Sequence, residues 1–268
     1  MLEVHPITAF NDNYIWLIKA PNQQNCWVVD PGDATPVQDY LTANNLNLEG
    51  ILLTHHHYDH IDGVAKLVKQ GVEVVGFAKD SKRLPTLTKP VKEGTTFELL
   101  GYPVKVMEVP GHTLGHIVYF IEGNDRKETN QPLLFSGDTL FAAGCGRMFE
   151  GTAEQMQASL QSLAALPAAT QVFAAHEYTL SNLKFALKVE PNNTDSQRRM
   201  IKTTQLREAN LPTLPSDIKT ELATNPFLRL NQPEVLASLK TQTKEADWAN
   251  LTNPAEAFKL LRSWKDNA

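Results

Sequence analysis

Residues 54–60, with the sequence THHHYDH, place four histidines and one aspartate directly after a short apolar run. While the chain is still extended, His55 and His57 point to the same side, so their two imidazoles can bind one metal ion. Once the chain turns, Asp59 and His60 can face a second ion nearby. Burying this many polar groups without a metal would cost several kcal/mol. The segment therefore predicts part of each of two neighbouring metal sites.

Three further candidate ligands each follow an apolar, strand-like run. They are His112 after Val104–Val109, Asp138 after Leu133–Phe135 and His176 after Val172–Ala175. If these strand ends share one edge of the fold, five imidazoles and two carboxylates converge, a ligand set suited to zinc, iron or manganese. Two divalent ions about 3.5–4 Å apart need a shared anion, which a carboxylate together with a hydroxide supplies. The spacing therefore predicts a dinuclear metal centre.

The remaining polar residues near these segments have less specific patterns. His5, His56 and His116 lie outside the ligand spacing, so we expect structural roles or support of a ligand. Asp30, in the segment VVDPGD, could accept a hydrogen bond from a ligand and orient it, or could be a turn residue. Both interpretations of Asp30 stay open from the sequence.

Other catalytic schemes find little support. The two cysteines, Cys26 and Cys145, are too few for a disulfide framework or a cysteine-held zinc site. Cys145 lies among glycines near Arg147, where a reactive thiol is conceivable, but a small residue in a tight turn explains it better. The sequence contains no serine-hydrolase elbow, phosphate loop or dinucleotide turn.

The overall composition indicates a globular protein that folds on its own. The 268 residues are 42% hydrophobic, enough for the core of one large domain or of a domain plus a smaller appendage. The net charge of -5 and the absence of a basic tract argue against nucleic acid as a partner. No leader and no membrane-length apolar run are present, so we expect a cytoplasmic monomer without a membrane partner.

Up to about residue 176, short β-rich runs alternate with helical segments, which is typical of an α/β fold. The expected strands are Tyr14–Ile18, Trp27–Val29, Ile51–Leu53, Val72–Val75, Val104–Val109, Ile117–Ile121, Leu133–Phe135 and Gln171–Ala174. The expected helices are Thr35–Asn44, Gly63–Gln70 and Thr152–Ala165. Sheets covered by helices are the expected packing.

After residue 176 helical patterns dominate, which predicts a domain boundary there. The expected helices are Tyr178–Val189, Thr194–Ala209, Ser216–Ala223 and Asn253–Trp264. The last is the best marked, because Asn253 can cap it and Pro254 suits its first position. Its apolar residues at helical spacing predict a buried face made by Phe258, Leu261 and Trp264.

The motif T-H-x-H-x-D-H, with the later His, Asp and His, resembles the metallo-β-lactamase superfamily. This resemblance implies a four-layer αββα sandwich with the metal site at one sheet edge, over residues 1–176, and a helical substrate-binding domain over residues 177–268. Within the superfamily, five further segments resemble the glyoxalase II (hydroxyacylglutathione hydrolase) family. They are NDNYIW at 11–16, GCGRMFEGTA at 144–153, HEYT at 176–179, NPFLR at 225–229 and RSWKD at 262–266.

Carried over residue by residue, the resemblance implies roles for eleven positions. The first metal is expected on His55, His57 and His112, the second on Asp59, His60 and His176, with Asp138 bridging both; Asp59, His60 and Asp138 are the expected catalytic residues. Zinc is the expected metal, with iron or manganese as alternatives. Glutathione is expected to contact Arg147, Tyr178, Arg262 and Lys265. One departure is the stretch Arg147-Met148-Phe149, where many relatives have Lys-Phe-Tyr, so Phe149 cannot make a phenol hydrogen bond to the substrate.

The implied activity is hydrolysis of S-D-lactoylglutathione to glutathione and D-lactate, the second step of methylglyoxal detoxification, by attack of a metal-bridging hydroxide on the thioester. The alternatives are another hydrolase on the same centre, such as a lactonase, a β-lactamase or an RNA-processing nuclease. A mononuclear-iron persulfide dioxygenase and a non-catalytic metal-binding module are further alternatives. The helical tail argues against the other hydrolases, and the complete second ligand set argues against the dioxygenase.

Overall fold

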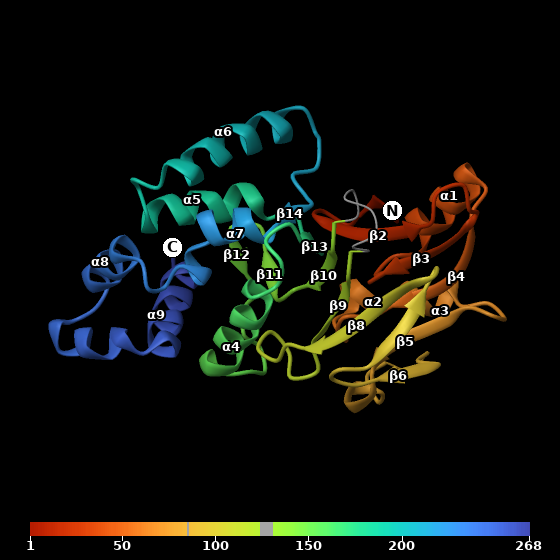
Figure 1. Cartoon of the computed structure of the whole chain (residues 1–268), viewed down its shortest axis with the longest axis horizontal. Helices are drawn as coiled ribbons and strands as arrows, with labels where there is room; N and C mark the ends of the chain where they lie inside the picture. Colours follow the sequence, from red (N-terminus) through yellow and green to blue (C-terminus); the bar gives the residue numbers. More distant parts are fainter. Residues whose placement is uncertain (85, 124–130) are drawn as a thin grey trace. The chain divides into compact units, whose positions relative to one another are not determined.

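The computed structural model describes residues 1–84, 86–123 and 131–268, which form two compact units (Figure 1). Unit 1 comprises Met1–Val109, Gly115–Gly137 and Phe173–His176, and unit 2 comprises Pro110–Leu114, Asp138–Val172 and Glu177–Ala268. The chain thus passes between the units several times. The domain boundary expected near residue 176 stays a prediction.

The first sheet of unit 1 has the strand order β1-β2-β3-β4-β5-β6. Its strands are β1 (Glu3–Ala9), β2 (Asn13–Lys19), β3 (Asn25–Val29), β4 (Asn47–Leu52), β5 (Glu73–Phe77) and β6 (Lys89–Val91). The strands from β1 to β3 pair antiparallel, and those from β3 to β6 pair parallel. Side chains of β2 are buried on both faces, which explains its nearly continuous apolar sequence.

A second, antiparallel sheet of unit 1 contains β7 (Thr96–Leu99), β8 (Tyr102–Glu108), β9 (Ile117–Ile121) and β10 (Leu133–Gly137) in that order. The last two residues of β13 (Gln171–Ala174) extend it beside β10. The two sheets pack face to face. The Trp16 ring meets Phe173 edge-on with centroids 5.0 Å apart, and the buried Tyr119 hydroxyl donates to the Leu53 carbonyl at 2.8 Å.

Three short helices and one turn of 3₁₀ helix complete unit 1: α1 (Ala34–Asn44), α2 (Tyr58–Ile61), α3 (Val64–Leu67) and η1 (Ala78–Asp80). Val37 of α1 and Leu67 of α3 pack with Leu17 and Val28 in one buried apolar cluster on the first sheet. The helix expected at 63–70 is therefore shorter, and a separate helix precedes it. The α/β character expected for this part of the chain is confirmed.

Unit 2 is mainly helical. Its helices are α4 (Ala153–Ala164), α5 (Thr179–Val189), α6 (Thr194–Glu208), α7 (Ile218–Thr224), η2 (Pro226–Leu228), α8 (Pro233–Thr241), η3 (Glu245–Thr252) and α9 (Pro254–Asp266). Two short strand pairs accompany them: β11 (Leu140–Phe141) with β12 (Gly144–Cys145), and the first half of β13 with β14 (Ser216–Asp217). The predicted C-terminal helical region is confirmed.

Local capping explains where two helices of unit 2 begin. Thr152 and Gln155 form a reciprocal capping box at α4. The Asn253 side chain accepts from the Ala255 N–H at 3.0 Å at α9. Phe258 and Leu261 are fully buried as predicted, whereas Trp264, the third residue of the predicted face, is only partly buried. Within the described ranges, no helix has both the length and the apolar character needed to cross a membrane.

Candidate active site

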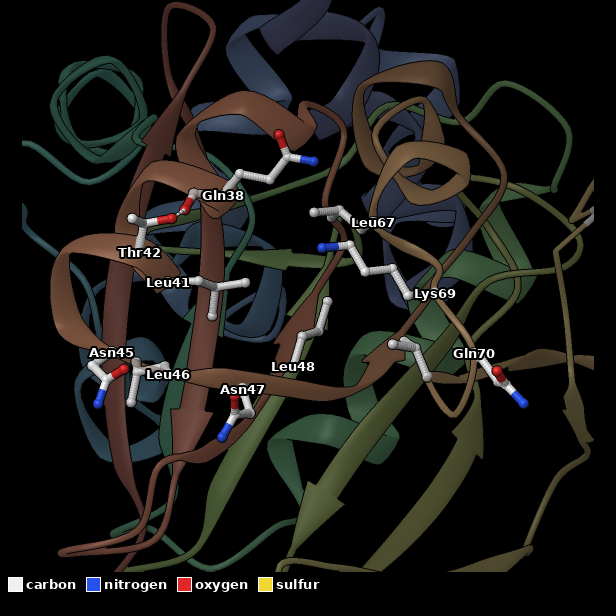
Figure 2. A pocket seen from close by; sticks show the side chains of 11 residues that line it. Gln38, Leu41, Thr42, Asn45, Leu46, Asn47, Leu48, Leu67, Lys69 and Gln70 are labelled. Carbon is white, nitrogen blue, oxygen red and sulfur yellow. Dashed lines mark hydrogen bonds between the residues drawn. The ribbon is translucent and has the colours of Figure 1, made fainter.

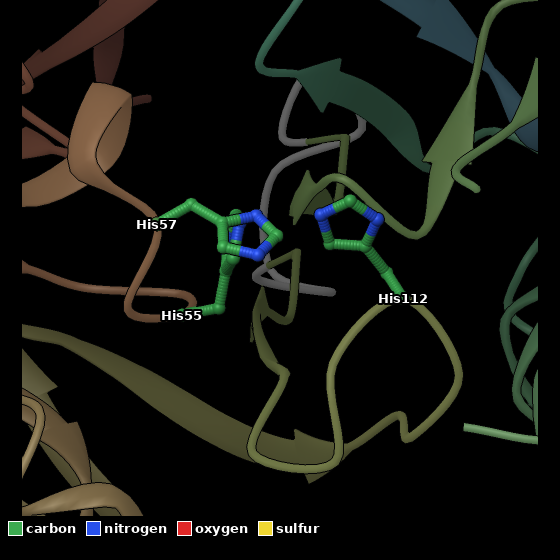
Figure 3. Close-up of side chains that lie close together, drawn as sticks. All are labelled: His55, His57 and His112. Atoms are coloured by element: carbon green, nitrogen blue, oxygen red, sulfur yellow. The ribbon is translucent and has the colours of Figure 1, made fainter. Parts of the chain in front are cut away.

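His55 and His57 follow β4 in unit 1, and their rings turn toward each other (Figure 3). His55 Nε2 lies 3.0 Å from His57 Nδ1, and His55 Nδ1 lies 3.0 Å from Thr54 Oγ1. Imidazole nitrogens directed at one point can serve as ligands of one ion. His112, also drawn in Figure 3, belongs to unit 2 and is described with that unit.

Asp59, His60 and His176 gather in unit 1 with potential ligand atoms all within 4.8 Å of one another. Asp59 Oδ2 lies 3.5 Å from His60 Nε2 and 3.5 Å from His176 Nε2. A tetrahedral ion about 2.1 Å from each of two ligands holds those ligand atoms roughly 3.4 Å apart. The spacing of these side chains therefore fits a bound divalent ion.

Asp30 orients the His60 ring. Asp30 Oδ2 lies 3.0 Å from His60 Nδ1, and the same carboxylate accepts the Thr54 N–H at 2.8 Å and the Thr54 hydroxyl at 2.6 Å. With Nδ1–H donated to Asp30, Nε2 of His60 keeps its lone pair for a metal. Asp30 also has a φ of 52°, in the left-handed region typical of turns. Asp30 is thus both a turn residue and the hydrogen-bond acceptor that orients a predicted ligand, the two roles that the sequence left open.

Two supporting residues of unit 1 had no role assigned from the sequence. Asp12 Oδ1 lies 2.8 Å from His176 Nδ1 and orients that ring as Asp30 orients His60. The Asn13 amide donates to Asp59 Oδ2 at 3.0 Å and fixes the carboxylate. Both lie in the segment NDNYIW, where short polar residues between two strands signal only a turn.

The histidines outside the ligand spacing lie apart from these groups or support them. His116 is fully buried and stacks on the His55 ring with centroids 4.7 Å apart. His56 Nδ1 lies 3.2 Å from the buried Asp80 carboxylate, and His5 Nε2 lies 3.7 Å from Glu3 on the surface. His116 therefore limits the rotation of the neighbouring His55 ring, and His56 anchors the loop.

Unit 2 contains the other two predicted ligands, His112 and Asp138. His112 Nδ1 lies 2.8 Å from the Arg147 carbonyl oxygen, which accepts its proton. His112 Nε2 lies 3.4 Å from Asp138 Oδ2. This is the arrangement seen for His60 and His176: an oxygen acceptor on one ring nitrogen, and a carboxylate at metal-bridging distance from the other.

A pocket of about 490 Å³ in unit 2 is lined by all six predicted site residues of that unit. They are His112, Asp138, Arg147, Tyr178, Arg262 and Lys265. The pocket thus contains two predicted metal ligands, His112 and Asp138, together with three cationic side chains and the phenol of Tyr178. Such a lining suits an anionic small molecule.

The three cations of this pocket differ in their surroundings. Arg147 is exposed, whereas Arg262 is only 3% exposed and donates to the Cys145 carbonyl at 3.1 Å and to Asp266 at 2.7 Å. Lys265 Nζ donates to the Asn182 side chain, and burial lowers the pKa of Lys265 to about 8. Arg262 therefore supports the structure as well as lining the pocket, and Lys265 changes charge near neutral pH.

Cys145 lines the same pocket but is poorly suited to act as a nucleophile. Its side chain is 3% exposed, and burial raises the pKa of its thiol. A buried, protonated thiol is a weak nucleophile. The sequence favoured a small residue in a tight turn at this position, but Cys145 instead lies in the short strand β12, paired with Leu140.

A separate hollow of about 750 Å³ lies in unit 1 between α1, β4 and the segment at 67–72 (Figure 2). Its lining is made of leucines, a valine, amides and a threonine, with Lys69 as its one charged side chain among the described residues. It contains none of the predicted site residues. The chemistry of this protein is therefore not expected there.

Comparison with known proteins gives two matching family models. Residues 9–176 match the metallo-beta-lactamase superfamily, and residues 177–268 match the hydroxyacylglutathione hydrolase C-terminus. The hydroxyacylglutathione hydrolase of Vibrio parahaemolyticus is 50% identical over 266 residues, 99% of each chain. The B3 metallo-beta-lactamase BLEG-1 has a TM-score of 0.60 at 22% identity over 85% of this chain and 99% of its own, which shows the shared fold. TTHA1623, solved in a di-iron-bound form, has a TM-score of 0.51 at 27% identity over 64% of this chain and 91% of its own.

Proposed function

Because this chain belongs to the hydroxyacylglutathione hydrolases of the metallo-β-lactamase superfamily, we propose that it hydrolyses S-D-lactoylglutathione to glutathione and D-lactate. It is a metal-dependent hydrolase, and this reaction is the second step of methylglyoxal detoxification. The observation that carries the substrate proposal is the pocket of unit 2, which combines His112 and Asp138 with Arg147 and Lys265. Glutathione has two carboxylates, which these cations can bind.

The residues expected as metal ligands fit two divalent ions. His55 and His57 would bind the first ion, and Asp59, His60 and His176 would bind the second. We propose that His112 completes the first site and that Asp138 is the anion shared by both. The di-iron form of TTHA1623 supports a two-metal centre. Zinc is our proposed metal because it suits a histidine-rich ligand set. Nitrogen and oxygen ligands also accept iron and manganese, which are therefore the alternatives.

Bound divalent ions supply a nucleophilic hydroxide near neutral pH and polarise the thioester carbonyl. The side chains prepare this site by holding protons in place. Asp12 and Asp30 accept Nδ1–H of His176 and His60, so that Nε2 of each ring stays available as a ligand. Asn13 keeps Asp59 turned toward both rings. These residues therefore fix the protonation and orientation of the second ligand set.

The leaving group explains why no strong acid is needed. The thiol of glutathione has a pKa near the ~8.5 of cysteine, so a thiolate can depart without being protonated first. The alkoxide released from an ester or lactone and the amine nitrogen released from a β-lactam are far more basic and would require an acid. The site should therefore prefer a thioester to oxygen esters, lactones and β-lactams.

The test compares S-D-lactoylglutathione with a lactone and a β-lactam on protein of measured metal content. We expect about two metal ions per chain and a kcat/KM for the thioester at least ~100-fold higher than for the others, since selectivity depends on differential transition-state stabilisation. Comparable rates on the lactone would favour the lactonase. One iron with oxygen consumption would favour the dioxygenase, and metal without any hydrolysis would indicate a binding module.

The pKa of Lys265 gives a prediction for pH dependence. Because the pKa of Lys265 is lowered to about 8 by burial, its ammonium is charged below that pH and neutral above it. A bound carboxylate favours the charged form, so KM for the glutathione thioester should rise about tenfold as pH increases through this range. Steady-state kinetics from pH 6.5 to 9.5 measure this, with correction for spontaneous thioester hydrolysis.

The control for this pH effect is Lys265→Arg, because arginine stays charged throughout the range. We expect the arginine variant to show a flat KM between pH 7 and 9. A wild-type KM that is also flat would show that Lys265 does not bind the carboxylate in its charged form.

We further propose that the enzyme acts as a cytoplasmic monomer on this small molecule. Its two cysteines are both buried thiols without a disulfide, which suits a reducing compartment. Size-exclusion chromatography with light scattering tests the oligomeric state, and a mass of twice 29.8 kDa would contradict the monomer.

A further inference from the structure

The β11–β12 hairpin of unit 2 connects Asp138 to Arg147. Its register pairs Phe141 with Gly144 across a two-residue turn. Ala143 in that turn has a φ of 54°, a left-handed conformation that residues with a Cβ rarely adopt. Turns of this length usually contain glycine or asparagine. The hairpin therefore needs support from outside its own sequence.

Two fully buried side chains supply that support. Glu221 Oε2, on α7, accepts the Ala143 N–H at 2.7 Å. Asn225, directly after α7, donates from Nδ2 to the Gly144 carbonyl at 2.9 Å and to the Phe141 carbonyl at 3.2 Å. The strained turn is thus held by hydrogen bonds on both of its strands and at its tip.

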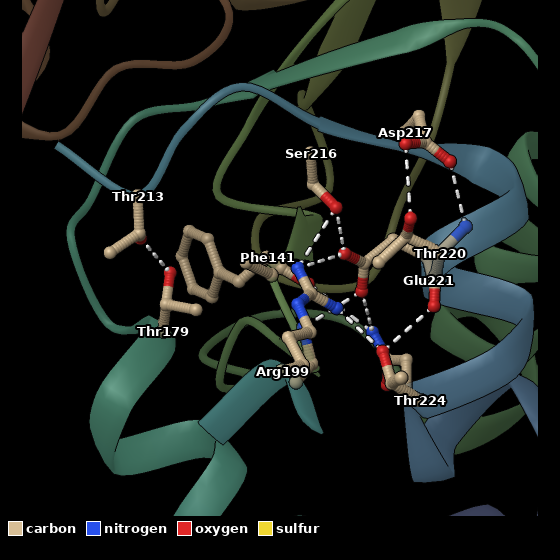
Figure 4. A network of polar contacts seen from close by, with 12 residues as sticks. Phe141, Thr179, Arg199, Thr213, Ser216, Asp217, Thr220, Glu221 and Thr224 are labelled. Atoms are coloured by element: carbon tan, nitrogen blue, oxygen red, sulfur yellow. Dashed lines mark hydrogen bonds and ion pairs between the residues drawn. The ribbon is translucent and has the colours of Figure 1, made fainter. Parts of the chain in front are cut away.

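The Glu221 carboxylate is itself fixed by a polar network (Figure 4). Arg199 Nη2 donates to Glu221 Oε1 at 2.7 Å, and Arg199 Nη1 donates to Thr224 Oγ1 at 2.6 Å. The Ser216 hydroxyl donates to the same carboxylate. Because the buried charge is paired and its oxygens are hydrogen-bonded, Glu221 is held in one position against the hairpin.

The hairpin brings its two ends together beside the predicted ligands. The Gly146 N–H donates to the Thr139 carbonyl at 3.2 Å, and a Cβ on Gly146 would lie 1.9 Å from the Asp138 carbonyl oxygen. The next carbonyl, that of Arg147, accepts the His112 Nδ1 proton at 2.8 Å. The register of the hairpin therefore sets Asp138 relative to the acceptor that orients His112.

We propose that Glu221 and Asn225 are positioning residues for the metal centre, acting through the β11–β12 hairpin. This inference rests on the proposed function, because it assumes that Asp138 and His112 bind metal. Neither Glu221 nor Asn225 is among the residues that line the pocket. Their side chains instead determine whether Asp138 and His112 meet a metal ion in a fixed arrangement.

The decisive variant is Asn225→Asp. An aspartate has nearly the same shape and can still accept the Phe227 N–H, as Asn225 Oδ1 does at 3.1 Å. It cannot donate to Gly144 and Phe141, and it adds a negative charge beside Glu221. Glu221→Gln is the second variant, since a single amide oxygen cannot serve both Ala143 and Arg199.

The matched control is Glu190→Gln. The Glu190 carboxylate is 2% exposed and binds the Arg229 guanidinium at 2.8 and 2.9 Å, in the same helical region but on the α5 side. It removes a comparable buried ion pair whose hydrogen bonds do not involve the hairpin. Any effect common to all three variants reports stability, and any effect confined to Asn225 and Glu221 reports positioning.

Three readouts apply: hydrogen exchange of amides in 140–146, metal affinity by competition with a chelator, and thioester kinetics. We expect Asn225→Asp and Glu221→Gln to exchange hairpin amides at least ~10-fold faster and to bind metal roughly 10–100-fold more weakly, while Glu190→Gln matches the wild type. The inference is overturned if both variants keep wild-type exchange and metal affinity, or if Glu190→Gln changes them equally. If the wild type holds its metal but does not hydrolyse the thioester, the proposed function is wrong. Hydrogen exchange and metal affinity would then still test whether Glu221 and Asn225 position the metal ligands.

Discussion

Asp138→Ala is expected to lose both metal ions together and to lower kcat/KM by about a thousand-fold or more, because the metals are proposed to supply several kcal/mol of transition-state stabilisation. Asp138 is 7% exposed, and its Oδ2 lies 3.4 Å from His112 Nε2. A carboxylate shared by two ions reduces the repulsion between them. Without it, the remaining ligands would have to hold two like charges with less negative charge nearby.

Metal content by elemental analysis and kinetics on the same preparations measure the effect of Asp138→Ala. The control is Asp33→Ala, which removes the side chain that accepts the Thr35 N–H at 2.9 Å at the start of α1. That variant should lose about 1 kcal/mol of stability and keep its metals and activity. An Asp138→Ala protein that retains two ions and normal kcat/KM would rule out Asp138 as the bridging ligand.

Much of the fold follows from local patterns in the sequence. The buried strands β2, β9 and β10 are mostly apolar, and β4 ends in the buried apolar residues Ile51 and Leu52. The helices α5, α6 and α9 have clear caps or stops. Elements that were not predicted have weaker patterns: β1 contains His5 and Pro6, and α8 is a single short amphipathic helix. The first two residues of the helix expected at Ser216–Ala223 instead form the strand β14, which pairs with β13 in a long-range contact that no local pattern encodes.

The candidate site likewise contains some residues that the sequence predicts and others that it does not. His55, His57, Asp59 and His60 stand out because metal-binding spacing is local and unusual. The supporting residues do not, because each depends on a partner far along the chain. Asp12 lies 164 residues before His176, and Glu221 lies 78 residues after Ala143. Short polar side chains of this kind are common in turns and helices, so only their three-dimensional neighbours distinguish them.

Arg262 and Lys265 were both expected to contact glutathione, but their surroundings predict opposite effects on stability. Arg262→Ala should lower the free energy of unfolding by about 3 kcal/mol, because its buried guanidinium holds the Cys145 carbonyl and lies 5.3 Å from the centroid of the Phe227 ring. For a protein of this size that corresponds to a fall in Tm of roughly 5–10 °C.

Lys265→Met should leave Tm unchanged or raise it at pH 7. The pKa of Lys265 is lowered from 10.5 to about 8 in the folded protein, mainly by burial. A lowered lysine pKa means that the folded state disfavours the charged form, so this lysine destabilises the protein below pH 8, and the penalty disappears as pH rises from about 8 toward 10.5. Methionine has a similar length and no charge, so it removes the penalty.

Both variants should raise KM for the glutathione thioester about tenfold or more and change kcat little, if the contacts are equally strong in the ground and transition states. Thermal unfolding at pH 7 and pH 9.5 with kinetics on each variant separates the two effects. The stability difference between wild type and Lys265→Met should shrink at pH 9.5, whereas that for Arg262→Ala should persist, because arginine stays charged. If Lys265→Met is as destabilised as Arg262→Ala at pH 7, the Lys265 ammonium stabilises the fold through its hydrogen bond to Asn182. If KM is unchanged in both variants, neither Arg262 nor Lys265 binds the substrate.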